Sequence, residues 1–468
     1  MFNLSDTIAA ICTPPGMGSM AAIRISGSNS WNIIERFFFQ SSTHQHINTP
    51  VHLEHMHALH GYIKDGEKII DEVIVLPFKS PHSFTSEDTI EIFCHGSTHI
   101  ASMILDLCLK NGARIAKPGE FTFRAFVNGR IDLTEAEAIN ELICADSPRL
   151  IQGASEMLTG SLKEKIKFFR EELLNLITTI ESAIEFPQDV DSISKENIIT
   201  KLSEIKLNIN SLIESAKEGQ LLREGLKVSI IGTPNVGKSS LLNRLLENER
   251  AIVTSEPGTT RDILEEKITI DGWPIVLVDT AGIRHEADLN ESEKLGIERS
   301  KIALQISDIA LVLFDLTKGM NRETKELIGL ANGKQKIIVG NKIDLTDVGL
   351  SRDSNSRSTY PYDIAISAKH GTNLDKLKTL IIDRIRSVSQ NNSKGFENNI
   401  YINQRQKELL LQCSANIDYA LELCNKKSTE DILADELKKA LSKLDEVSGR
   451  IINDDVISNI FAKFCIGK

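Results

Sequence analysis

The most chemically informative stretch of this sequence is the glycine-rich segment GTPNVGKS, residues 232–239. It has the spacing G-x-x-x-x-G-K-S, with the apolar run LKVSII before it and the helical pattern SLLNRLLEN after it. In that context the backbone N–H groups of the loop can surround phosphates, the Lys238 ammonium can reach the β- and γ-phosphates, and the Ser239 hydroxyl can bind Mg²⁺. The segment therefore predicts a nucleoside-triphosphate site rather than an ordinary turn before a helix.

A second phosphate-site motif, DTAG, follows at residues 279–282 after the apolar run WPIVLV. Its carboxylate, Asp279, is expected beside Mg²⁺. In many GTPases the next residue is a glutamine that orients the attacking water, but here it is Ile283, whose side chain neither donates nor accepts a hydrogen bond. Hydrolysis at this site therefore needs another device.

The polar segment TSEPGTTRD, residues 254–262, is expected to be a switch loop that supplies this device. Thr260 can reach Mg²⁺, and backbone carbonyls of the loop can surround a monovalent cation beside the phosphates. Asn235 in the glycine-rich loop offers that cation a side-chain oxygen.

The base is specified by the motif NKID, residues 341–344, and the motif SAK, residues 367–369, each after an apolar run. The Asp344 carboxylate can accept hydrogen bonds from guanine N1–H and its exocyclic amine, and adenine has no matching pair of donors. Four motifs in this order predict a GTPase. The residues expected to bind GTP are Asn235, Val236, Gly237, Lys238, Ser239, Ser240, Thr254, Ser255, Glu256, Pro257, Gly258, Thr259, Thr260, Asp279, Thr280, Ala281, Gly282, Asn341, Lys342, Asp344, Ser367, Ala368 and Lys369.

The elements around these motifs predict a multidomain α+β protein. Short apolar runs alternate with helical segments around the motifs, which indicates a parallel sheet with crossover helices. The flanking stretches have helical periodicity without strands, so we expect one helical domain that is discontinuous in sequence and carries an inserted α/β domain. The predicted ranges are an α+β N-terminal domain at 1–120, helical parts at 121–220 and 386–468, and the GTPase domain at 221–385.

Composition points to a soluble cytoplasmic protein. None of the seven cysteines forms a C-x-x-C pair, which favours reduced thiols over a disulfide framework. The start of the sequence lacks the basic and apolar regions of a signal peptide, and no run is apolar enough to span a membrane. A formal charge of −11 argues against broad non-specific nucleic-acid binding. The histidine-dense segment HLEHMHALH at 52–60 lacks the ligands that would complete a metal site.

Several longer motifs resemble the family of the tRNA modification GTPase MnmE, also called TrmE. They are TPPGMGSMAAIRISG, KPGEFTFRAFVNGRIDL, PGTTRD after the glycine-rich loop, and the terminal CIGK. The resemblance covers nearly the whole chain. It implies a potassium-stimulated GTPase that dimerises and, with the flavoprotein MnmG in a heterotetramer-type complex, modifies the wobble uridine of certain tRNAs at C5 by a carboxymethylaminomethyl-type addition.

The resemblance also implies roles for individual residues of the GTPase domain. Mg²⁺ would be held by Ser239 and Thr260, and K⁺ by Asn235, Thr254, Glu256 and Thr259. The family's catalytic glutamate maps to Glu293 when counted back from the segment GIER, and to Glu291 when counted forward from DTAG. We prefer Glu293 as an indirect general base, since the following helix fixes its position better than the loop, with a solvated glutamate at a helix start as the alternative.

For the one-carbon donor, 5,10-methylene- or 5-formyl-tetrahydrofolate, the implied pocket residues are Arg24, Glu91, Arg130 and Lys468. Arg130 departs from the lysine that the family can have, which keeps the charge but changes the hydrogen-bond geometry. Arg24 and Glu91 can alternatively form an ordinary ion pair between strands. Cys465 is a candidate nucleophile or acid/base group in the uridine chemistry, and a packing role remains the alternative.

Two functions from different classes are therefore compared. The first is GTP hydrolysis coupled to tRNA modification. The second is a ribosome-assembly or other RNA-binding GTPase, which would share the nucleotide motifs but would have no need for the reduced-folate residues in the N-terminal domain.

Overall fold

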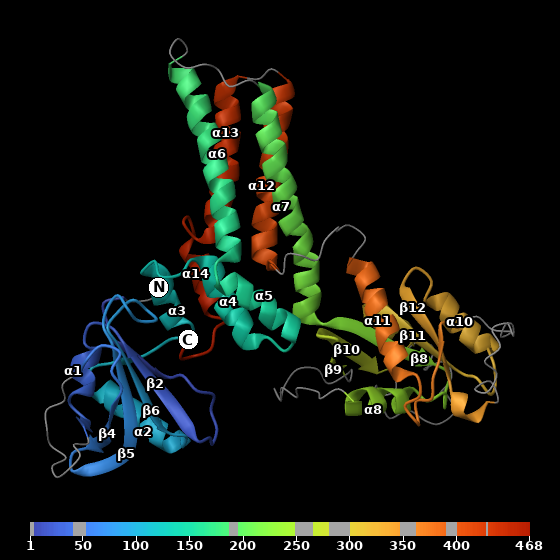
Figure 1. Ribbon diagram of the computed structural model, residues 1–468, viewed down its shortest axis with the longest axis horizontal. Coiled ribbons are helices and arrows are strands. Elements are labelled where there is room, and N and C mark those ends of the chain that lie inside the picture. Colours follow the sequence, from blue (N-terminus) through green and yellow to red (C-terminus); the bar gives the residue numbers. More distant parts are fainter. Residues whose placement is uncertain are drawn as a thin grey trace. The chain divides into compact units, whose positions relative to one another are not determined.

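The computed structural model describes residues 4–40, 53–186, 195–248, 265–279, 300–346, 362–389, 400–426 and 429–468. The chain divides into two compact units (Figure 1). Unit 1 contains residues 1–140, 157–200 and 415–468, and unit 2 contains residues 141–156 and 201–414.

The N-terminal part of unit 1 is built on a seven-stranded sheet with the strand order β3-β4-β5-β6-β2-β1-β7. Neighbouring strands are antiparallel, except for the parallel pair β1 and β7. The strands are β1 (Ile8–Ile11), β2 (Met20–Ser26), β3 (Phe38–Gln40), β4 (Leu59–Asp65), β5 (Lys68–Phe78), β6 (Thr89–His95) and β7 (Arg114–Ile115).

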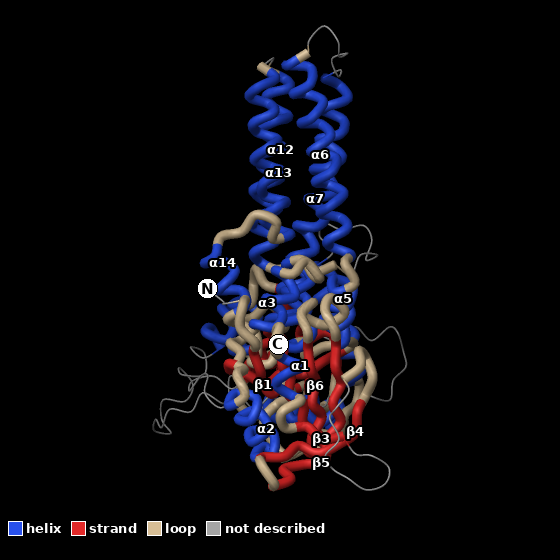
Figure 2. The backbone as a smooth tube through the Cα atoms, turned by 90° about the vertical axis from the view of Figure 1, so that its left-hand side faces the viewer, coloured by secondary structure: helices blue, strands red, loops and turns tan. Residues whose placement is uncertain are grey.

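One face of this sheet packs on helices α1 (Ser30–Ile34) and α2 (Thr98–Lys110), shown with the strands in Figure 2. Alternate residues of β2 and β6 point to this core, and Ile23 lies directly opposite Ile92 in the register of the two strands. Because side chains alternate between the faces of a sheet, the next pair, Arg24 and Glu91, lies on the opposite face. The register therefore places the two charged residues side by side.

The rest of unit 1 is helical. Helices α6 (Ser161–Glu185) and α13 (Glu430–Ser448) pack along each other, with Leu173 and Ile177 of α6 and Leu437 of α13 buried (Figure 1). An ion pair of 2.7 Å between Arg170 Nε and Asp445 Oδ1 joins the two helices. The other helices that belong wholly or partly to unit 1 are α3 (Glu120–Val127), α4 (Leu133–Cys144), α5 (Pro148–Leu158), α7 (Lys195–Glu224), α12 (Gln404–Asn425) and α14 (Asp454–Phe461).

Unit 2 contains a six-stranded sheet with the order β13-β12-β11-β8-β10-β9. All pairs are parallel except β9 with β10. The elements are β8 (Leu226–Gly232), α8 (Lys238–Asn248), β9 (Glu265–Ile270), β10 (Trp273–Asp279), β11 (Ile309–Asp315), α10 (Arg322–Leu330), β12 (Gln335–Asn341), a 3₁₀ turn at Ile343–Leu345, β13 (Ile364–Ala365) and α11 (Leu374–Ser389).

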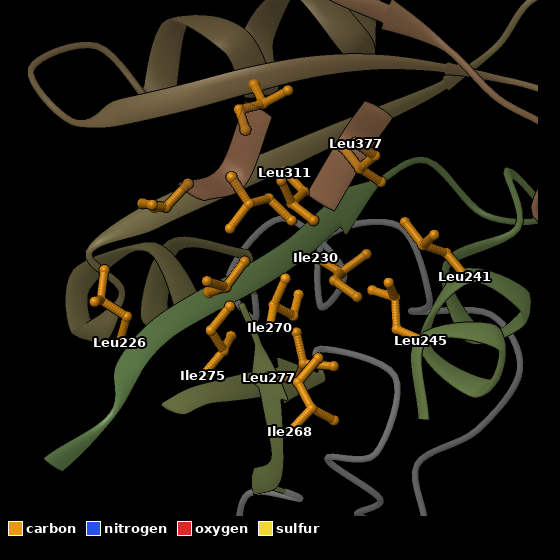
Figure 3. Packing of buried hydrophobic residues seen from close by; sticks show 14 of the residues in the cluster. Leu226, Ile230, Leu241, Leu245, Ile268, Ile270, Ile275, Leu277, Leu311 and Leu377 are labelled. Carbon is orange, nitrogen blue, oxygen red and sulfur yellow. The ribbon is translucent and has the colours of Figure 1, made fainter. Parts of the chain in front are cut away.

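The core of unit 2 lies between the sheet and its helices (Figure 3). Ile230 of β8 and Leu277 of β10 pack with Leu241 and Leu245 of α8, and Leu377 of α11 belongs to the same cluster. Parallel strands buried on both faces need continuous apolar sequence, which the run at Ile309–Asp315 provides. This core fixes the ends of the strands that carry the nucleotide motifs.

The predicted fold class is confirmed: the chain has an α+β N-terminal domain, helices on both sides of the insertion in sequence, and an α/β domain in which the glycine-rich loop at 232–239, the P-loop, connects β8 to α8. In the described parts of 131–220 and 400–468 the structure has helices and no strands, as the periodicity predicts. The domain boundaries at residues 120, 220 and 385 stay predictions. Among the described residues, no helix is both long and apolar enough to cross a bilayer.

Candidate functional site

The P-loop connects β8 to α8 and has the backbone conformation that a phosphate site requires. Asn235 and Gly237 adopt positive φ values of 61° and 100°. A Cβ at residue 237 would lie 2.3 Å from Asn341 Nδ2, so only glycine fits there. Lys238 Nζ donates hydrogen bonds of 2.9 Å to the carbonyls of Gly232 and Thr233, which keeps the ammonium over the loop.

Asn341, at the end of β12, joins the P-loop to the second base-binding segment. Its Nδ2 donates to the Val236 carbonyl at 2.8 Å, and its Oδ1 accepts from the Ala368 N–H at 2.9 Å. The side chain is buried, so both hydrogen bonds are protected from water. The structure thus brings the predicted phosphate and base motifs together at one edge of the sheet, where the carboxyl ends of β8, β11, β12 and β13 meet.

Charged side chains hold the NKID segment, residues 341–344, in place. Lys342, with a φ of 67°, places its Nζ 2.7 Å from Asp315 Oδ2 at the end of β11. Burial raises the pKa of Asp315, but hydrogen bonds from Lys342 and Thr317 outweigh it and hold the pKa below its usual value. Asp315 is therefore an anion that fixes the Lys342 stem beside the base site.

Asp344 is suited to accept hydrogen bonds from a base. A hydrogen bond from the Ser367 side chain lowers the pKa of Asp344, and the nearby charges of His370 and Lys369 act in the same direction. In the SAK segment, the Lys369 carbonyl accepts a 2.6 Å hydrogen bond from Arg244 Nη2 of α8. The helix that starts at the phosphate site thereby supports the loop that reads the base.

Part of the predicted nucleotide site lies outside the described residues. This applies to the whole switch loop, to the residues after Asp279, and to both candidate catalytic glutamates. Ser239 and Ser240 lie exposed in the first turn of α8, and Asp279 ends β10 opposite Ile230 in the register. The roles assigned to Thr254, Ser255, Glu256, Pro257, Gly258, Thr259, Thr260, Thr280, Ala281, Gly282, Glu291 and Glu293 remain predictions.

A second candidate site lies in unit 1, around Arg24 on β2. Arg24 Nε and Nη2 donate to Glu91 Oε1 at 3.0 and 2.8 Å, so the ion pair considered from the sequence is present. The pair leaves Arg24 Nη1 buried and without a hydrogen-bond partner among the described residues. A buried guanidinium N–H without a partner is costly, and a ligand with an acceptor group would satisfy it.

Arg130 joins this site through Phe84. The Phe84 ring lies 4.9 Å from Arg24 Cζ and 5.1 Å from Arg130 Cζ, and Arg130 Nη1 donates to the Phe84 carbonyl at 2.6 Å. Burial lowers the pKa of Arg130, and the charge of Arg24 lowers it further. Two guanidinium groups thus share one aromatic ring, which leaves a positive, partly aromatic surface that suits an anion with a planar ring system.

The C-terminal tail reaches the same site. Gly467 is buried, and a Cβ there would lie 2.5 Å from the Ile11 carbonyl oxygen and 3.0 Å from Cys12 Cα. The Lys468 carbonyl oxygen accepts from the Phe121 N–H at 3.3 Å, at the start of α3. The chain therefore ends in a slot between β1 and α3, which brings Lys468 to the side of the N-terminal domain that carries Arg24.

The two cysteines near the tail differ in environment. Burial raises the pKa of the Cys12 thiol, the charges of Arg24 and Lys468 oppose this, and the charge of Glu91 adds to it. Cys12 thus lies within electrostatic reach of three of the predicted folate residues. Cys465 is exposed, and its carbonyl accepts from the Gly119 N–H at 3.4 Å. Its chemical and packing roles both remain open.

The sequence analysis did not name some residues of these sites. Asp315 carried a signal, because an aspartate at the end of an apolar strand in this fold lies at the ligand edge of the sheet. No sequence signal points to Arg244, Phe84 or Cys12, because the residues that each of them meets at the site lie far away in the sequence.

Comparisons with known proteins agree with this architecture. A family model described as the MnmE helical domain matches residues 133–465, and another described as the GTP-binding protein TrmE N-terminus matches residues 7–130. The tRNA modification GTPase MnmE of Thermotoga petrophila is 37% identical over 464 residues, covering 99% of this chain and 100% of that protein. The MnmE of Moorella thermoacetica is 39% identical over 472 residues, with the same coverage of both chains.

Among solved structures, a variant of Era from Aquifex aeolicus bound to GDP and AlF4⁻ is 26% identical, with a TM-score of 0.24. The matched region covers 41% of this chain and 66% of the Era chain.

Proposed function

Because the chain belongs to the family of the tRNA modification GTPase MnmE, we propose that it hydrolyses GTP as one part of a reaction that modifies the wobble uridine of certain tRNAs. The observation that carries this proposal is the presence of two distinct sites. Unit 2 has the P-loop and the guanine-type motifs joined by Asn341, and unit 1 has a cationic, aromatic surface at Arg24, Phe84 and Arg130, with the backbone of Lys468 hydrogen-bonded to α3. A GTPase that only binds RNA has no use for the second site.

As the ligand of this surface in unit 1 we propose a reduced folate, 5,10-methylene- or 5-formyl-tetrahydrofolate, which would be the one-carbon donor. Its glutamate carboxylates suit the cations of Arg24, Arg130 and Lys468, and the planar pyrimidinone half of its reduced pterin suits the ring of Phe84. The unpartnered Arg24 Nη1 supports this fit. The modification at C5 would be of the carboxymethylaminomethyl type. The chain would act as a homodimer together with the flavoprotein MnmG. Both proteins would work in the cytoplasm.

For GTP hydrolysis we propose Mg²⁺ on Ser239 and Thr260, and K⁺ on Asn235, Thr254, Glu256 and Thr259. The exposed Asn235, held at the P-loop turn by its positive φ, supports the potassium assignment. K⁺ would supply positive charge beside the phosphates where Ile283 supplies nothing to water. Glu293 would then act on the attacking water as an indirect general base, with Glu291 as the alternative.

The competing function is a ribosome-assembly or other RNA-binding GTPase. Binding of 5-formyltetrahydrofolate to the full-length protein, measured by calorimetry, separates the two. We expect binding to the wild type, and Arg24→Lys should weaken it about tenfold or more, because a lost charge-assisted contact costs roughly 1.5–3 kcal/mol. Arg322→Lys, on an arginine whose side chain is 93% exposed, is the matched control and should bind as the wild type does.

No folate binding by the wild-type chain at millimolar concentration, together with association with ribosomal particles, would instead support the competing function.

A further inference from the structure

A short helical segment, residues 141–156, belongs to unit 2 with the GTPase sheet, whereas the residues on both sides of it belong to unit 1. It contains the end of α4 and most of α5. Both helices therefore begin or end in one unit and continue into the other. Any element of unit 2 that holds this segment also holds one end of each helix.

The element that holds it is the hairpin of β9 and β10. Arg149 Cζ lies 4.9 Å from the centre of the Trp273 ring, and Arg149 Nε donates to the Asp271 carbonyl at 3.3 Å. The hairpin turn allows this approach, because Asp271 and Gly272 have positive φ values of 50° and 79°, and a Cβ on Gly272 would lie 3.2 Å from Arg149 Cγ. One arginine thus contacts the turn and the first residue of β10.

Neighbouring contacts strengthen the same junction. Asp146 Oδ2 lies 3.4 Å from Lys267 Nζ on β9, and Leu150 is buried in the hydrophobic core of unit 2 with Trp273. At the end of α4, Glu141 Oε1 forms a 2.8 Å ion pair with Arg223 Nη2 of α7. The segment is therefore fixed by packing and by charge, and not by one surface contact.

The hairpin is also next in sequence to two of the predicted nucleotide segments. β9 begins at Glu265, three residues after the segment 254–262 to which we assign the cations, and β10 ends at Asp279, the first residue of DTAG. We therefore expect a change in those segments on hydrolysis to act on both strands. Arg149 contacts the opposite end of the hairpin, at its turn.

We propose that Arg149 is a positioning residue that couples GTP hydrolysis to the tRNA reaction, by holding α4 and α5 on the β9–β10 hairpin. This inference rests on the proposed function, since the coupled reaction is tRNA modification. Arg149 is not among the residues to which we assign nucleotide binding. Loss of its side chain should leave hydrolysis intact and disconnect it from events in unit 1.

Hydrogen exchange of the full-length protein tests the coupling without reference to tRNA. In the wild type, GDP with aluminium fluoride in potassium should change deuterium uptake in both 265–279 and 141–156, relative to GDP alone. In Arg149→Ala the change should persist in 265–279 and fall at least threefold in 141–156. An unchanged response of 141–156 in the variant, or no response of this segment in the wild type, overturns the proposal.

Two further variants guard against a general loss of structure. Arg149→Lys keeps a cation and an alkyl stem but loses the Nε donor and the planar group over Trp273, so it should show an intermediate effect. Arg322→Ala, at an exposed site of the same domain, should respond as the wild type does. A decrease in thermal midpoint that accounts for the loss in both Arg149 variants would assign Arg149 a structural role only.

The functional arm measures modified uridine in tRNA from cells that express each variant. Arg149→Ala should lower it at least tenfold while GTP hydrolysis stays within twofold of the wild type, and equal modification would overturn the proposal. If the wild-type chain itself restores no modified uridine, the proposed function fails, and the exchange experiment still decides whether Arg149 couples the hairpin to α4 and α5.

Discussion

Replacement of Gly467 by alanine tests whether the C-terminal tail completes the pocket in unit 1. Gly467 has a φ of 95°, and a Cβ there would lie 2.5 Å from the Ile11 carbonyl oxygen. The left-handed conformation costs a non-glycine residue about 1–2 kcal/mol, and overpacking of a filled site costs about 1–3 kcal/mol more. The tail should therefore leave its slot if its own contacts are weaker than this sum.

Two backbone hydrogen bonds join the last residues to the start of α3. The hydrogen bonds from Gly119 N–H to the Cys465 carbonyl and from Phe121 N–H to Lys468 are 3.4 and 3.3 Å long. At about 1 kcal/mol each they do not offset the strain. Phe464 is buried and should keep the preceding turn in place, so the displacement should be confined to the last four residues.

Gly467→Ala should weaken reduced-folate binding by the free energy that the Lys468 contact contributes. A charge-assisted contact of roughly 1.5–3 kcal/mol corresponds to about a ten- to a hundredfold increase in Kd, measured by calorimetry with 5-formyltetrahydrofolate. Gly66→Ala is the matched control, because Gly66 has a φ of 60° but no atom within 4 Å of a Cβ. Wild-type affinity in Gly467→Ala would refute the placement of Lys468 in the pocket.

Three further predictions concern the reacting groups. GTP hydrolysis should be faster in potassium than in sodium, and Asn235→Ala should remove the difference; equal wild-type rates in the two salts would exclude the cation site. Glu293→Ala should lower the hydrolysis rate by about 10²-fold at near-normal nucleotide affinity, and if only Glu291→Ala does so, the glutamate is misassigned. Cys465→Ser should keep folate binding and abolish modified uridine if the thiol is chemical, whereas a modest loss in step with stability would indicate packing.

The sequence predicts the parts of this protein that are determined locally. The P-loop is recognisable because its glycines, its lysine and the flanking strand and helix are contiguous. The motifs that follow β8, β12 and β13 are then expected to meet, because these strands are parallel and their carboxyl ends lie at one edge of the sheet. The helical stretches are predictable for the same reason, because their apolar period is a local property.

Contacts between distant residues were not predictable in this way. The sequence gives no sign that Arg244 supports the Lys369 carbonyl or that Phe84 lies between two arginines, because each contact depends on how separate elements pack. The segment 141–156 has helical periodicity like its neighbours, and its assignment to unit 2 depends on contacts with residues far away in the sequence, such as the packing of Leu150 in the core and of Arg149 on Trp273. Counting back from GIER gives Glu293 and counting forward from DTAG gives Glu291, because this sequence has two residues more between these motifs than the family pattern.

The most direct test of the central claim is the nucleoside composition of tRNA from cells that lack this protein. The account predicts that the carboxymethylaminomethyl-type modification at C5 of the wobble uridine disappears in the deletion strain. It should return when the wild-type chain is expressed and stay absent with Lys238→Ala, because the P-loop lysine is needed for GTP turnover. An unchanged wobble-uridine profile in the deletion strain would contradict the account.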